Sequence, residues 1–98
     1  MVQHIVFWNL KDFAEGGAKE ENARIIKERL EALAGKIEGT LKMEVRPNFN
    51  PDGYDLVLYS LFESREALDF YKDHPLHKAV QKFVHSVITD RAVTDSDM

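Results

Sequence analysis

Two stretches of the chain are apolar on both faces of an extended strand. In residues 2–10, alternate positions place one set on one face: Val2, His4, Val6, Trp8 and Leu10. Ile5 and Phe7 occupy the other face. Residues 54–62 repeat the pattern, with Leu56 and Leu58 on one face and Val57, Tyr59 and Leu61 on the other. Successive side chains of a strand point to opposite faces, so both stretches are predicted to be central strands covered on both sides.

Apolar residues at steps of three and four predict three helices, over residues 18–34, 64–73 and 75–84. Ser64 is suited to cap the second helix. Pro75 disfavours helical geometry in the residue before it, so this helix must end near Asp73 or His74, and Pro75 can open the next helix. The face of the third helix is predicted to carry Leu76, Val80, Phe83 and Val84.

The remaining segments predict two further strands and their connections. Residues 40–47 alternate, with Leu41, Met43 and Val45 on one face and Lys42, Glu44 and Arg46 on the other. This pattern predicts a half-exposed edge strand that ends at Pro47. Residues 11–17 read as a loop and 48–53 as a turn. The weak alternation of residues 87–94 predicts a last strand. The polar composition of residues 94–98 predicts a frayed tail.

The predicted order β-α-β-β-α-α-β indicates an α+β fold of the ferredoxin-like, split-βαβ kind with a four-stranded antiparallel sheet. The first and third strands are central in this topology, which agrees with their two-sided apolar pattern. Helices cover only one face of such a sheet. The other face would be wet in a monomer, so we expect a sheet-to-sheet homodimer through Ile5, Phe7, Val57, Tyr59 and Leu61.

Composition narrows the classes of function. Residues 1–98 fit one domain, with a net charge of −4 and dispersed Lys and Arg that give no nucleic-acid footprint. Cysteine is absent, which excludes disulfides and cysteine nucleophiles and suits a cytoplasmic protein. The apolar start reads as a strand rather than a signal peptide, and no run is long enough to span a membrane. The glycines match no phosphate-binding or dinucleotide motif, so we expect no nucleotide cofactor.

The candidate chemistry gathers in residues 71–77, around the break between two helices. An imidazole can take and return a proton near neutral pH, so His77 is the candidate base and Tyr71 its partner toward a carbonyl oxygen. Each also has a structural interpretation: His77 as a helix cap, and Tyr71 as a core residue with a wet hydroxyl. His74 and His77 have too few neighbouring ligands to predict a metal site.

The sequence resembles the stress-responsive A/B barrel family, the dimeric α/β-barrel (Dabb) domain, over nearly its whole length. The resemblance rests on His4 with Val6 and Trp8, on residues 42–46, 54–58 and 62–68, and on Tyr71 followed by His74-Pro75-Leu76-His77. It implies a dimer whose two sheets form a barrel. One branch of the family is a cofactor-free polyketide cyclase, whose catalytic Tyr and His match Tyr71 and His77.

The match to the cyclase branch is incomplete. A third-strand histidine of its pocket has no counterpart, since Leu56 lies in that neighbourhood, and Asn22, Ala23 and Ile26 stand where its first helix has aromatic residues. We therefore expect one of two functions. The first is a small-molecule-binding protein with cofactor-free acid/base chemistry on a carbonyl compound. The second is a non-enzymatic stress-response protein acting through oligomeric stability. The candidate pocket residues are His4, Val6, Trp8, Leu56, Leu58, Tyr71, His74 and His77.

Overall fold

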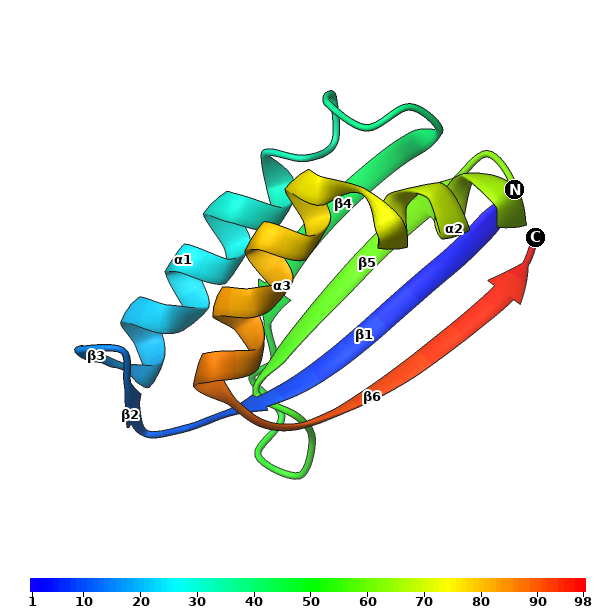
Figure 1. Ribbon diagram of the computed structural model, residues 1–98. Helices are drawn as coiled ribbons and strands as arrows, with labels where there is room; N and C mark the ends of the chain where they lie inside the picture. Colours follow the sequence, from blue (N-terminus) through cyan, green and yellow to red (C-terminus); the bar gives the residue numbers. More distant parts are fainter.

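A computed structural model describes residues 1–98. The main elements are β1 (Val2–Leu10), α1 (Lys19–Glu31), β4 (Thr40–Pro47), β5 (Leu56–Phe62), α2 (Arg65–Asp73), α3 (Pro75–Val87) and β6 (Ile88–Asp97). A short hairpin, β2 (Phe13–Ala14) and β3 (Gly17–Ala18), precedes α1. The helices lie in one layer and the long strands in another (Figure 1). None of the helices is long and apolar enough to cross a lipid bilayer.

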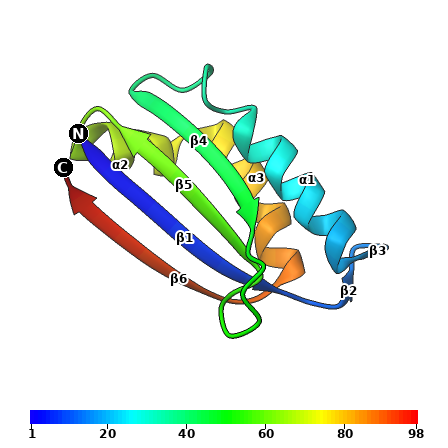
Figure 2. The ribbon, with the colours of Figure 1, turned by 180° about the vertical axis from the view of Figure 1, so that it is seen from behind.

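The sheet has four antiparallel strands in the order β4-β5-β1-β6. The predicted ferredoxin-like α+β fold is therefore confirmed, and so are the central positions of β1 and β5. Seen from behind, no helix covers the far face of the sheet (Figure 2). Register places Phe7 opposite Val57 and Ile5 opposite Tyr59, so these four side chains share that open face.

The core fills the space between the sheet and the helices with 18 buried side chains. Strand β1 contributes Val2, Val6, Trp8 and Leu10 through its regular alternation. Helix α1 ends at Glu31 rather than at residue 34, and the chain continues in turns. Leu33 and Ile37 are nevertheless buried. The spacing of apolar residues therefore predicted which side chains are buried, but the predicted helix was too long.

Strand β4 departs from the predicted alternation at its start. Thr40 pairs with Phe62 and Lys42 with Leu61, so the register shifts between them and Leu41 is the extra residue of a bulge. Thr40 is consequently buried and Leu41 is 47% exposed, which makes the predicted inward position of Leu41 wrong. Met43 and Val45 do face the core, and β4 is an edge strand as predicted.

Three other boundaries differ from the predictions. The predicted loop over residues 11–17 contains β2 and the first residue of β3, with Gly16 at a φ of 74° in the tight turn. Helix α3 continues to Val87, and its Leu76 is exposed rather than packed. The tail does not fray, because β6 pairs with β1 as far as Asp97. Asp97 also forms an ion pair with Arg65.

The break between α2 and α3 follows the predicted local chemistry. Ser64 caps α2 by accepting a hydrogen bond from the Ala67 N–H at 3.0 Å. His74 is extended, with φ −67° and ψ 135°, and Pro75 begins α3. The Nδ1 atom of His74 accepts the Leu76 N–H at 3.1 Å, so this imidazole is occupied as the cap of α3. The backbone therefore changes direction between Tyr71 and His77.

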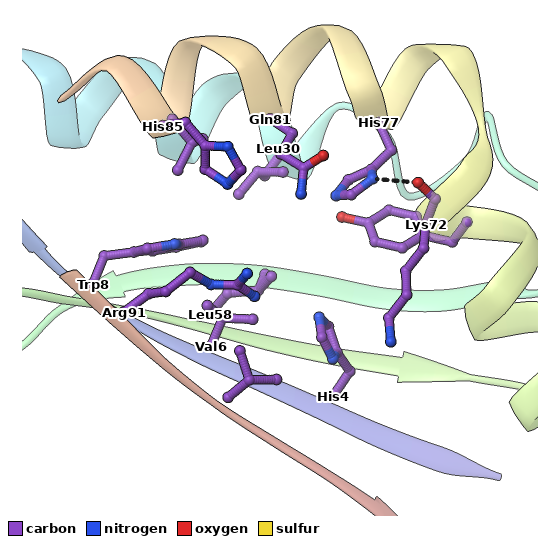
Figure 3. A pocket seen from close by; sticks show the side chains of 13 residues that line it. His4, Val6, Trp8, Leu30, Leu58, Lys72, His77, Gln81, His85 and Arg91 are labelled. Atoms are coloured by element: carbon purple, nitrogen blue, oxygen red, sulfur yellow. Dashed lines mark hydrogen bonds between the residues drawn. The ribbon is translucent and has the colours of Figure 1, made fainter. Parts of the chain in front are cut away.

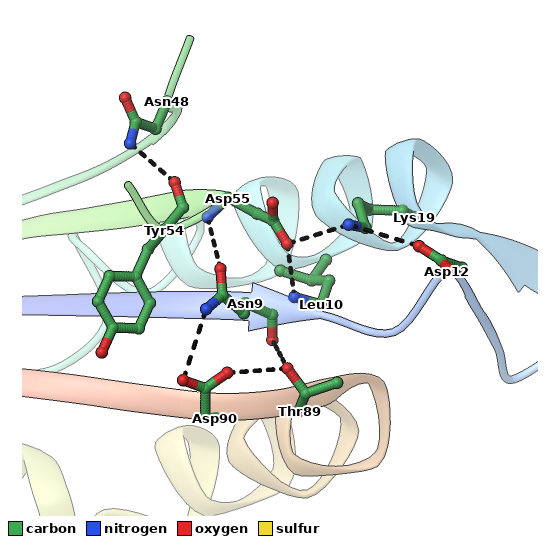
Figure 4. Close-up of polar contacts among 9 residues, drawn as sticks. All are labelled: Asn9, Leu10, Asp12, Lys19, Asn48, Tyr54, Asp55, Thr89 and Asp90. Atoms are coloured by element: carbon green, nitrogen blue, oxygen red, sulfur yellow. Dashed lines mark hydrogen bonds and ion pairs between the residues drawn. The ribbon is translucent and has the colours of Figure 1, made fainter. Parts of the chain in front are cut away.

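A carboxylate joins β5, β1 and α1 at one end of the sheet (Figure 4). Asp55 accepts a hydrogen bond from the Leu10 N–H at 2.8 Å and pairs with Lys19 at 3.2 Å. Its own N–H donates to the Trp8 carbonyl and the Asn9 side chain. Lys19 also reaches Asp12 at 3.5 Å. Asp55 thus anchors the end of β1 to the first turn of α1.

We expect Asp55→Ala to lower the free energy of unfolding by about 1–3 kcal/mol, because the Leu10 N–H loses its acceptor. Asp12→Ala is the matched control, since it removes a carboxylate of the same network whose side chain is fully exposed. An exposed ion pair contributes about 0–1 kcal/mol. Urea denaturation measures both variants, and equal losses would contradict the anchoring role of Asp55.

Candidate functional site

A cavity of about 290 Å³ lies between the sheet and the helices, next to the break between α2 and α3. Its volume is near the lower limit for small-molecule pockets. Six of the predicted pocket residues line it: His4, Val6, Trp8, Leu58, Tyr71 and His77. His4 rises from β1 and His77 descends from α3, so imidazoles face the cavity from opposite walls (Figure 3).

Two predicted pocket residues lie elsewhere. Leu56 is buried but does not line the cavity, because it pairs with Trp8 at the end of β5 remote from α2 and serves the core. His74 also lies outside the cavity, because its ring caps α3 and packs edge-on against Phe70 at 5.7 Å. The placement of these two residues in the pocket was therefore wrong.

The cavity has further lining residues that the sequence analysis did not select. From α3 come Gln81, Val84 and His85, from α2 Lys72, from α1 Leu30, and from β6 Arg91 and Val93. Gln81 and His85 follow His77 at steps of four, a spacing that places all three on one helix face and could have identified them. Register identifies the β6 residues, since Val93 lies opposite Val6 and Arg91 opposite Trp8.

The Tyr71 hydroxyl is buried and has no hydrogen-bond partner in the protein. The residue is 1% exposed, and its ring lies 4.2 Å from the His77 ring between centroids. Burial raises the pKa of Tyr71 well above its usual value, because the phenolate would lose its solvation. Tyr71 is therefore a protonated donor at neutral pH and cannot act as a base.

The tautomer of His77 follows from its hydrogen bond. Its Nδ1 lies 3.1 Å from the Lys72 carbonyl oxygen, which can only accept, so Nδ1–H is the donor (Figure 3). Burial lowers the pKa of His77, and the positive charge of Arg91 acts in the same direction. The neutral ring therefore predominates at pH 7, and its Nε2 atom carries a free lone pair.

His4 is held in a similar state on the opposite wall. Its Nδ1 hydrogen bonds to the Asp95 carboxylate, which also lies 3.8 Å from the Lys72 ammonium. Burial lowers the pKa of His4, although the hydrogen bond and charge of Asp95 oppose this effect. The carboxylate orients the ring with Nδ1 as donor, which leaves Nε2 as the acceptor.

The arrangement combines a phenol donor, two neutral imidazoles and an apolar wall. A base, a donor for a developing oxyanion and a dry space are the parts that proton abstraction beside a carbonyl needs. The apolar wall consists of Val6, Trp8, Leu58 and Val93. No group of three or more His, Cys, Asp or Glu side chains is placed to hold a metal ion.

Comparisons with known proteins agree on the fold. The profile of the stress responsive A/B barrel domain matches residues 2–98. A dimeric ferredoxin-like protein of unknown function from Bacteroides fragilis is 34% identical, with 99% of this chain and 95% of that chain covered and a TM-score of 0.83. No curated protein matches the chain.

More distant structures share the fold at lower identity. A protein of Arabidopsis thaliana is 22% identical, with 100% of this chain and 95% of that chain covered and a TM-score of 0.84. A hydroxynitrile lyase from Passiflora edulis is 17% identical, with 97% of this chain and 90% of that chain covered and a TM-score of 0.81. These two likenesses bear on the fold and leave the substrate open.

Proposed function

We propose a function for this chain, which belongs to the stress-responsive A/B barrel domain family. Its cavity binds a small carbonyl compound. The protein catalyses proton transfer on this compound without a cofactor. His77 is the base, Tyr71 is the donor to the carbonyl oxygen, and Val6, Trp8 and Leu58 form the apolar wall. His4 faces the same ligand from β1 and orients it.

The observation that carries this proposal is the Tyr71 hydroxyl. It is buried and unpartnered beside an imidazole whose Nε2 is free. Burial of a hydroxyl without a hydrogen bond costs about 1–3 kcal/mol in proteins. A residue with a purely structural role would be more stable as phenylalanine. A carbonyl oxygen in the cavity gives this hydroxyl the acceptor that the protein itself does not supply.

The chemistry requires only groups present in the chain. The Nε2 atom of His77 takes a proton from the carbon next to the ligand carbonyl, and the C–H electron pair moves to form the enolate. The Tyr71 O–H donates a hydrogen bond to the enolate oxygen as its charge develops. His77 then returns the proton to carbon, or the enolate carbon attacks a second carbonyl carbon of the same ligand. In that case the C=O π electrons move to oxygen, and the alkoxide takes the proton from His77. General-base assistance of this kind contributes about 10²–10⁴ in rate.

A homodimer is part of the proposal. The open face of the sheet carries Ile5, Phe7, Val57, Tyr59 and Leu61, and no helix covers it (Figure 2). A two-fold interface uses the same patch twice, so a second copy of the chain can cover it. The dimeric description of the related Bacteroides fragilis protein supports this arrangement.

Tyr71→Phe tests the function with the smallest possible change. Because the hydroxyl has no partner in the protein, the ligand-free variant should melt at or above the wild-type temperature. A screen of phenolic ketones and lactones by thermal shift should give hits with wild type that bind about fivefold more weakly to the variant, as expected for one lost hydrogen bond of about 1 kcal/mol.

Tyr54→Phe is the matched control, since Tyr54 packs against Phe7 outside the cavity. It should leave ligand binding unchanged. Unaltered binding by Tyr71→Phe would show that the hydroxyl does not contact the ligand. A fall in melting temperature for Tyr71→Phe, combined with no hit in the screen, would instead favour the non-enzymatic, structural alternative.

A further inference from the structure

The lining of the cavity includes an arginine without a partner. Four of the five arginines of the chain make a contact: Arg24 with Glu21 and Glu28, Arg46 with Glu44, Arg65 with Asp97, and Arg29 with the Phe83 ring. Arg91 has neither a side-chain hydrogen bond nor an ion pair, although it lines the cavity. We propose that Arg91 binds a carboxylate of the ligand, an inference that rests on the proposed function of the cavity.

The register of the sheet fixes the position of Arg91. It lies opposite Trp8, whose side chain faces the helices, so Arg91 projects from the same face of β6. Its side chain extends over the cavity floor below Gln81 (Figure 3). Burial is the main cause of the lowered pKa of His4 and of His77, and the positive charge of Arg91 adds to it at both rings, which is consistent with a guanidinium directed toward the two imidazoles.

The acidic groups that share this strand face with Arg91 already have partners. Side chains alternate along β6, so Asp95 and Asp97 share the face of Arg91. Asp95 contacts His4 and Lys72, and Asp97 pairs with Arg65. Because Asp95 balances Lys72, Arg91 is the unpaired positive charge of the cavity lining, although the chain as a whole has a net charge of −4.

A carboxylate is the anion that fits this combination. The planar guanidinium offers parallel N–H donors that match two carboxylate oxygens. The apolar wall beside Arg91, formed by Trp8, Val6 and Val93, suits the body of an aromatic or aliphatic acid. With the carbonyl group at Tyr71 and His77, the substrate class is an apolar keto acid whose carboxylate lies against Arg91.

A matched pair of compounds tests this assignment. The probes are 3-benzoylpropionate, an aryl ketone with a carboxylate, and its primary amide, which is neutral and nearly the same shape. We expect calorimetry at low salt to show that wild type binds the acid at least tenfold more tightly, about 1.4 kcal/mol. Arg91→Gln should reduce binding of the acid to the level of the amide and leave binding of the amide unchanged.

Two further variants sharpen the test. Lys82→Gln removes a positive charge from α3 at an exposed position outside the cavity, and it should leave the preference for the acid intact. Arg91→Lys keeps the charge but loses the parallel donors, and it should retain only part of the preference. Arg91 is exposed, so these substitutions leave the core untouched.

The outcomes separate this inference from the proposed function. Equal binding of acid and amide to wild type, or an unchanged preference in Arg91→Gln, would overturn the role of Arg91 while the cavity remained a ketone site. Failure of both compounds to bind wild type would overturn the keto-acid assignment and the proposed ketone chemistry together.

Discussion

Replacing His77 by alanine should slow the exchange of the hydrogens next to the carbonyl of a bound ketone by about a hundredfold to ten-thousandfold. The loss is expected to be this large because His77 is the proposed base, with Nε2 unoccupied and its ring 4.2 Å from the Tyr71 ring between centroids. His77 is only half-buried, so the fold should persist. Exchange into deuterated water, followed by NMR with 3-benzoylpropionate, measures the rate.

The pH profile identifies the same group. Burial lowers the pKa of His77 below its ordinary value of 6.5, so more than half of the imidazole is in the basic form at pH 6.5. The wild-type exchange rate attributable to His77 should therefore fall to half of its high-pH value only below pH 6.5. His74→Ala is the control, because His74 caps α3 outside the cavity and its loss should leave the rate unchanged. A rate unaffected by His77→Ala would exclude His77 as the base.

Tyr59→Glu should convert the proposed dimer into monomers. Tyr59 lies on the open face of the sheet opposite Ile5, and a two-fold interface would bury the new carboxylate in both copies. Arg46, whose guanidinium lies 5.5 Å from the Tyr59 ring, already pairs with Glu44. Burying a further charge costs several kcal/mol after relaxation, so we expect the dimer to dissociate at least about a hundredfold more readily. Sedimentation velocity at micromolar concentration distinguishes the two states.

Phe70→Glu is the matched control for the dimer, since Phe70 is an exposed aromatic residue on α2, in the helix layer on the other side of the sheet. It should leave the sedimentation coefficient unchanged. A monomeric wild-type protein would contradict the interface, and so would a Tyr59→Glu variant that sediments as a dimer.

Local chemistry made the central parts of this fold predictable. Strands β1 and β5 are apolar on both faces, and this pattern alone placed them in the centre of the sheet. Ser64 and Pro75 act on their immediate neighbours, so the boundaries of α2 and the start of α3 followed from the sequence. His4 reached the cavity wall because alternation along β1 is uninterrupted.

Features that depend on pairing between distant segments were not predictable. Leu41 faces solvent because β4 contains a bulge opposite β5, and no local signal marks a bulge. Residues 94–97 are polar and look frayed, yet backbone pairing with β1 orders them. The contribution of Arg91 to the cavity depends on its register opposite Trp8, which the weak alternation of β6 did not reveal.

The most direct test of the central claim, that the cavity beside Tyr71 binds a carbonyl ligand, is a titration followed by the ¹⁵N shifts of the four histidine side chains. We expect 3-benzoylpropionate to move the Nε2 resonances of His77 and His4, whose rings face the cavity. His74, which caps α3, should not move. Ligand-induced shifts confined to His74, or no shift of any histidine, would contradict the account.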